Sequence, residues 1–114
     1  MISEQAKNPQ RYCQGAEIEK IADHYGLQHQ LYKSVEELIE LVQAVQDYSF
    51  KLGMRDDEIS TEHVVDEIAD VKIMIAQLEY LLELEEEVND RVEFKLNRQM
   101  DRIKLEKESV QHEM

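Results

Sequence analysis

Five acidic residues of this chain are spaced in a way that can hold a metal ion. Glu36, Glu37 and Glu40 form one group, and Glu67 and Asp70 form a second. Glu37 and Glu40 are three residues apart, as are Glu67 and Asp70, so each pair would lie on one face of a helix. Two such helices packed side by side would bring these four carboxylates together. Because crowded carboxylates repel one another, the pattern predicts a cation between the helices.

The types of ligand indicate which cation this would be. Oxygen ligands alone suit hard cations such as Mg²⁺, Mn²⁺ or Ca²⁺. The sequence lacks the calcium-loop signature of alternating acids around a glycine, so we expect Mg²⁺, with Mn²⁺ as the alternative. A zinc site is not indicated, because the sequence has a single cysteine, Cys13, and no suitable pair of histidines. A di-iron bundle would need Glu-x-x-His on two helices, and no histidine of this chain follows a glutamate by three residues.

Helices must position these acids. With only 3 glycines and 1 proline in 114 residues, the composition favours helices nearly throughout. We therefore predict one all-α domain over residues 1–114. A loose arm is expected over 1–14, where Pro9 discourages a helix, and a polar tail over 105–114. The predicted helices span residues 16–25, 27–50, 61–83 and 88–105. Gly26 ends the first, Ser60 or Thr61 caps the third, and an acidic run at 83 and 85–87 marks the turn before the last. The last helix is expected to face the core with Val92, Leu96, Met100 and Ile103.

The predicted acids lie beside apolar stripes of the two central helices. In the first, a polar line that includes Gln30, Lys33 and Glu37 runs next to an apolar stripe that we expect to face the core. The members of that stripe are Leu31, Val35, Leu38, Val42 and Val45. In the second, Glu67 and Asp70 are bracketed by apolar residues on their own face. A charged group in such a place needs a partner or a metal.

Charge and composition exclude several classes of function. The formal net charge of −13 argues against binding to a nucleic-acid backbone, which requires a basic surface. No apolar run approaches the length that spans a bilayer, and the N-terminus does not have the features of a signal peptide. The single cysteine cannot form an internal disulfide, so the cytoplasm is the expected compartment.

A short basic row complements the acids. Lys95, Arg98 and Arg102 follow one another at steps of three and four in the last helix, and Lys33 stands beside the first acidic group. Such cations can bind phosphate oxygens, although salt bridges within the last helix are an alternative role for the row. Metal ions held by carboxylates can activate water and stabilise a leaving phosphate. Together these residues indicate hydrolysis of a phosphate anhydride.

The two acidic groups in this order resemble a known signature. Glu36-Glu37-x-x-Glu40 followed by Glu67-x-x-Asp70 is similar to the EExxE and ExxD motifs of the MazG-like, all-α nucleoside triphosphate pyrophosphatases. The resemblance extends upstream to the run His-Tyr-Gly-Leu-Gln-His-Gln at 24–30 and downstream to residues 95–103, so it covers most of the chain.

The resemblance implies an antiparallel helical bundle that is completed as a homodimer or homotetramer. It implies magnesium-dependent cleavage of a nucleoside triphosphate, ribo or deoxy, to the monophosphate and pyrophosphate, and with it a role in cleaning the nucleotide pool. The implied metal ligands are Glu37, Glu40, Glu67 and Asp70. Glu36 would assist catalysis or orient water, and Lys33, Lys95 and Arg98 would contact phosphates. The aromatic residue that contacts the base stays open among Tyr25, Tyr32, Tyr48 and Phe94.

Two alternative functions follow from the same residues. The chain could be a non-enzymatic acidic helical adaptor whose carboxylates pair with lysines of a partner. Burial of Glu67 and Asp70 would argue against this, because an adaptor gains nothing from buried acids. The chain could also be a related all-α hydrolase that acts on another phosphate anhydride, such as phosphoribosyl-ATP, which the acidic signature does not distinguish.

Overall fold

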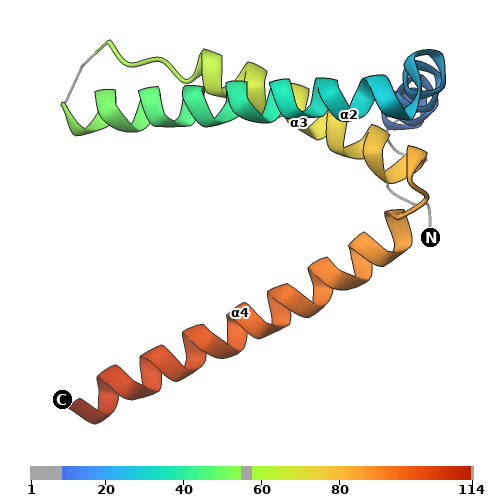
Figure 1. The fold of residues 1–114 in the computed structure, drawn as a ribbon. Coiled ribbons are helices and arrows are strands. Elements are labelled where there is room, and N and C mark those ends of the chain that lie inside the picture. Colours follow the sequence, from blue (N-terminus) through green and yellow to red (C-terminus); the bar gives the residue numbers. More distant parts are fainter. Residues whose placement is uncertain (1–8, 55–57, 114) are drawn as a thin grey trace. The chain divides into compact units, whose positions relative to one another are not determined.

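The structure is a computed structural model that describes residues 9–54 and 58–113, and in these residues it contains helices joined by turns and short loops. The helices are α2 (Pro9–Gly53), α3 (Glu62–Leu81) and α4 (Glu85–Glu113) (Figure 1). The described part of the chain is therefore all-α, as predicted. None of its helices is long and apolar enough to cross a membrane.

Helix α2 consists of two helical segments joined at Gly26. The backbone of Gly26 has φ 83° and ψ 167°, so the first segment ends where the sequence predicted. A positive φ of this kind is strained for any residue with a Cβ, and Gly avoids the strain. No atom lies within 4 Å of the position that a Cβ would take, so the backbone angle rather than lack of space requires glycine here.

The ends of the helices differ from the prediction in two places. Helix α2 begins at Pro9, whereas a loose arm was expected as far as residue 14, because proline is compatible with the first turn of a helix. Residues 1–8 of that arm lie outside the described residues. Helix α4 continues to Glu113, beyond the predicted end near residue 105. Its tail is polar but contains neither glycine nor proline, the two residues that most disfavour a helix.

Two compact units make up the chain, residues 1–83 and residues 84–114. In the first unit, the long segment of α2 after Gly26 lies beside α3 (Figure 1). The pairing is antiparallel, since Gln30 contacts Gln77 while Glu37 and Glu40 meet Glu67 and Asp70. The buried apolar residues of this unit are few and mostly small: Ala22, Ala44, Val71 and Met74.

The prediction of which residues of α2 form the core is wrong, because a different face of the helix packs against α3. The predicted stripe is between 42% and 55% exposed in this chain, as Leu31 and Val35 illustrate. The buried face of α2 is instead the neighbouring line, in which Gln30, Ser34 and Glu37 are all less than 9% exposed. The buried Ser34 hydroxyl donates a hydrogen bond to the Leu31 backbone carbonyl, one turn earlier in the same helix, over 2.7 Å. The interface between the two helices is thus unusually polar.

The second unit is the single helix α4. Three glutamates at 85–87 occupy its first turn, where negative charge stabilises the N-terminus of a helix. Glu83 precedes them with φ 55°, which marks the turn that the acidic run predicted. The residues that were expected to be core lie at 36% exposure or more: Val92, Leu96, Met100 and Ile103.

Candidate metal centre

Four carboxylates meet between the two helices of the first unit. Glu37 and Glu40 come from α2, and Glu67 and Asp70 come from α3. Each of the four offers one carboxylate oxygen, and these oxygens all lie within 4.8 Å of one another. We call this group the carboxylate cluster. Since neither helix supplies more than two of its members, the cluster exists only because α2 and α3 pack in this register.

The cluster has a buried side and an open side. Glu37 is 8% exposed, and the Glu67 side chain is 12% exposed. Glu40 and Asp70 are exposed, which corrects the expectation that Asp70 is enclosed by apolar residues. The argument from burial against an adaptor therefore rests on Glu37 and Glu67. An open side leaves room for water or a substrate beside the buried pair.

Two oxygens of the cluster are buried without a hydrogen bond. They are Oε2 of Glu37 and Oε2 of Glu67. The other oxygen of each carboxylate has a partner at 3.4 Å, Lys33 Nζ for Glu37 and His63 Nε2 for Glu67. A buried carboxylate oxygen with no donor is costly, because it has lost water and gained nothing. A cation between the two helices would supply the missing interaction, so the residues present fit a bound metal ion.

The electrostatics of the cluster agree with this reading. The pKa of Glu37 is raised, chiefly by burial and also by the negative charges of Glu40 and Asp70, while Lys33 opposes the shift. The pKa of Lys33 is raised in turn by its contacts with Glu37 and Glu36. Without a cation, one lysine ammonium at the edge of the cluster offsets part of the repulsion among the acids.

Three other predicted site residues, Glu36, Lys95 and Arg98, are not members of the carboxylate cluster. Glu36 is an exposed neighbour of the cluster, and its Oε2 lies 3.4 Å from Lys33 Nζ. Lys33 therefore bridges Glu36 and Glu37. Lys95 and Arg98 belong to α4 in the second unit. The Arg98 guanidinium lies 6.0 Å from the centre of the Phe94 ring, and the phosphate role of both basic residues stays a prediction.

A residue that the sequence reasoning set aside touches the cluster. No role was assigned to His63 from the sequence, yet its Nε2 lies 3.4 Å from Glu67 Oε1. The sequence contained a signal for this contact, because residues four apart on a helix are neighbours. The His63 side chain is 65% exposed, whereas the Glu67 side chain that it contacts is 12% exposed.

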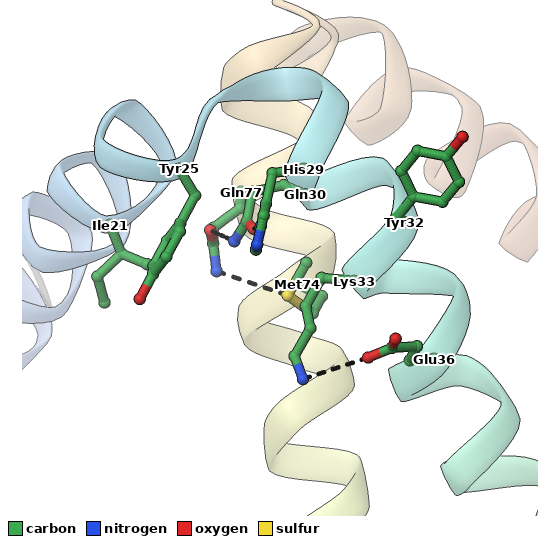
Figure 2. A pocket seen from close by; sticks show the side chains of 9 residues that line it. All are labelled: Ile21, Tyr25, His29, Gln30, Tyr32, Lys33, Glu36, Met74 and Gln77. Carbon is green, nitrogen blue, oxygen red and sulfur yellow. Dashed lines mark hydrogen bonds and ion pairs between the residues drawn. The ribbon is translucent and has the colours of Figure 1, made fainter.

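A cavity of about 550 Å³ adjoins the carboxylate cluster (Figure 2). It is lined by residues of α2 and α3, namely Ile21, Tyr25, His29, Gln30, Tyr32, Lys33, Glu36, Met74 and Gln77. Lys33 and Glu36 belong to its wall and also to the surroundings of the cluster. Of the four aromatic candidates for base contact, Tyr25 and Tyr32 line this cavity. Tyr48 lines a different hollow, near His63 and Asp66.

Comparisons of the chain with models of protein families, with curated proteins and with solved structures found no match. What the protein does therefore has to be inferred from the site itself.

Proposed function

We propose that this protein is a magnesium-dependent nucleoside triphosphate pyrophosphohydrolase of the MazG-like type. The observation that carries the proposal is the pair of buried, unpartnered oxygens on Glu37 and Glu67, with Glu40 and Asp70 within reach. Paired acids on two packed helices in this order are also what the resemblance of the sequence rests on. The products would be a nucleoside monophosphate and pyrophosphate.

The composition of the cluster supports magnesium as its metal. All four ligand atoms are carboxylate oxygens, which suit hard cations, and Mn²⁺ is the closest substitute. Magnesium keeps part of its water shell and binds substrate phosphates together with a few carboxylates. The exposed side at Glu40 and Asp70 is compatible with both requirements. When bound, metal ions of this kind supply a Lewis acid and an activated water.

Residues beside the cluster have distinct tasks in the proposed reaction. Water attacks the α-phosphorus, the bond from that phosphorus to the bridging oxygen breaks, and pyrophosphate leaves. Glu36 is exposed and shares Lys33 with Glu37, and we assign it the task of accepting the proton of the attacking water and passing it to solvent. The Lys33 ammonium, 3.4 Å from both Glu36 and Glu37, is positioned to bind a phosphate oxygen.

Assembly with further copies of the chain is part of the proposal. Large apolar side chains of α2 are exposed in the single chain, among them Val35 at 55%, Leu38 at 46% and Val42 at 55%. A contiguous exposed apolar surface marks an interaction site, and a second copy presents a matching one. We therefore expect a homodimer or homotetramer in solution.

The experiment that tests the function is pyrophosphate release from a panel of ribo- and deoxynucleoside triphosphates, with Mg²⁺ and with a chelator. We expect release of pyrophosphate and monophosphate only with the metal. Phosphoribosyl-ATP belongs in the panel, because its hydrolysis with no turnover of triphosphates would favour the related hydrolase. Absence of both turnover and Mg²⁺ binding, the latter measured by calorimetry, would leave the acidic adaptor as the better interpretation.

A further inference from the structure

A chain of hydrogen bonds runs along one wall of the cavity, from the exposed His29 to the buried Gln30 and Gln77. His29 Nδ1 lies 2.7 Å from Gln30 Oε1, and Gln30 Nε2 donates to Gln77 Oε1 over 2.6 Å. Gln30 and Gln77 are 3% and 2% exposed, and 47 positions separate them in the sequence. We call these two residues the glutamine pair. Two amides buried between helices are costly unless their donors and acceptors are satisfied.

The hydrogen bonds of this chain run in one direction, from His29 through Gln30 to Gln77. An amide oxygen only accepts, so His29 Nδ1 must carry the hydrogen that Gln30 Oε1 receives. Gln30 must then present its NH₂ group to Gln77 Oε1. Gln77 is left with its own NH₂ group, whose recorded acceptor is the Met74 sulfur at 3.7 Å. A thioether is a weak acceptor, so the Gln77 NH₂ group, at the end of this series of hydrogen bonds, has no strong acceptor.

The surroundings of this donor suit a flat ring. Tyr25 and His29 are stacked with their ring centres 4.8 Å apart and their planes 19° from parallel. Tyr25 is 52% exposed, so part of its ring remains available for contact. Figure 2 shows Tyr25, His29 and the glutamine pair grouped together, while Tyr32 points away from them. The cavity thus combines an aromatic surface with a directed hydrogen-bond donor.

The cavity lies at a suitable distance from the carboxylate cluster for a nucleotide. Gln30 precedes Glu37 by seven residues on α2, and Gln77 follows Asp70 by seven on α3. Seven residues are nearly two helical turns, so both sets lie on the same faces about 10 Å apart along the helices. Lys33 and Glu36 lie between them on the cavity wall. A nucleotide with phosphates at the cluster would place its base near the glutamine pair.

We propose that this cavity is the nucleobase subsite and that Gln77 Nε2 donates to a carbonyl oxygen on the Watson–Crick edge of the base. The enzyme would therefore prefer bases with a carbonyl at pyrimidine C4 or purine C6. A base with an amino group at that position, such as cytosine or adenine, would place its own N–H donors against the Gln77 NH₂ group. This inference rests on the proposed function, which supplies the triphosphate end of the ligand.

The test compares dUTP with dCTP, which differ only on this edge of the base. The double variant Gln30→Met/Gln77→Met removes both amides together, which leaves no buried donor without a partner and preserves side-chain volume. Its matched control is Gln43→Met/Gln46→Met, which changes two exposed glutamines of α2. A 1,2-dideoxyribose triphosphate, which has no base, reports on the metal centre alone. Circular dichroism checks that both variants are folded.

For the wild type we expect kcat/KM to be at least about tenfold higher for dUTP than for dCTP, the value of one good hydrogen bond. The double variant should lose this preference, and its rate on the base-free triphosphate is the reference to which its rates on dUTP and dCTP are compared. The control variant should retain the preference. A wild type without preference for dUTP would overturn the proposal, as would a double variant that still discriminates.

A separate measurement distinguishes failure of the subsite from failure of the proposed function. If the wild type hydrolyses no triphosphate, the function is wrong, and binding of free uridine then tests the cavity alone. Uridine should shift the side-chain amide resonance of Gln77 in a nitrogen–proton correlation spectrum, and cytidine should shift it far less. The same measurement applies if the double variant does not fold. An amide resonance that uridine leaves unchanged would overturn the proposal.

Discussion

Two buried polar sites between α2 and α3 differ in how their polar atoms are satisfied. The glutamine pair forms a hydrogen bond across the helices, and His29 satisfies the outer oxygen. The carboxylate cluster, nearly two turns away, keeps an unpartnered buried oxygen on Glu37 and on Glu67. Neutral amides can satisfy each other because each has a donor and an acceptor, whereas ionised carboxylates only accept. Lys33 and His63 each reach only one oxygen of the facing carboxylates, so a cation would supply the partner that the other two oxygens lack.

The contrast between the glutamine pair and the carboxylate cluster predicts that a change within the cluster will have the largest effect on activity. Glu67→Gln replaces a metal ligand with a neutral amide, and we expect a loss of activity of about 100-fold or more. The measurement is the rate of pyrophosphate release under saturating Mg²⁺. Asp66→Asn is the matched control, since Asp66 is exposed on the same helix and lies outside the cluster. Equal rates for the two variants would contradict the assignment of Glu67 as a ligand.

A second prediction concerns stability with and without the metal. Mg²⁺ at a hundredfold excess over its dissociation constant should stabilise the wild type by about 2.7 kcal/mol, by mass action on the folded state. Glu37→Gln should abolish most of this gain, and without metal it should be more stable than the wild type because repulsion in the cluster falls. Thermal unfolding with Mg²⁺ and with chelator measures both effects. If metal-free Glu37→Gln were less stable than the metal-free wild type, repulsion among the carboxylates would not be what destabilises the empty cluster.

A third prediction separates the glutamine pair from the cluster. The single variant Gln30→Ala leaves the Gln77 amide buried without its donor, and we expect a cost of about 1–3 kcal/mol in the free energy of unfolding. The double variant Gln30→Met/Gln77→Met should cost less than the single one, because no amide is left unpaired. Urea denaturation of both variants makes the comparison. Chelator should affect the stability of both as it affects the wild type, since neither changes the cluster.

The smallest expected effect is a pH dependence that arises from Glu37. Because its pKa is raised in the folded state, the folded protein binds this proton more tightly than the unfolded chain does. The resulting stability is fully present below the ordinary pKa of a glutamate and is lost as pH rises through the raised value. The advantage of metal-free Glu37→Gln over the wild type should therefore shrink as pH falls from about 7 to about 5. Denaturant titrations at both pH values test this, and a constant difference would contradict it.

The helices were largely predictable because helix formation depends on local sequence. Gly26 ends the first segment as expected, and the turn before α4 coincides with the acidic run. The cap of α3 was predicted at Ser60 or Thr61. Thr61 is the N-cap residue but makes no side-chain cap hydrogen bond, whereas the Ser60 hydroxyl accepts one from the Glu62 backbone amide over 3.2 Å. The early start at Pro9 was missed because the same residue can open a helix or prevent one.

The inward face of α2 could not be predicted from periodicity. Residues such as Val35 and Glu37 lie on adjacent lines of one helix, and a helical pattern does not reveal which line meets a neighbour in the same chain. The apolar line was taken as the core, yet the polar line faces α3. The tertiary packing of a small, polar interface overrode the hydrophobic pattern, which leaves the apolar line exposed in the single chain.

The sequence by itself determined which acids share a helical face, because a spacing of three residues has the same consequence in any α-helix. Only the tertiary structure decided that Glu37 and Glu67 are the enclosed members, while Glu40 and Asp70 face solvent. It also decided that Gln30 meets Gln77. Contacts between residues this far apart in the chain depend on the register of two packed helices. That register is set by how their side chains interdigitate, which no local spacing encodes.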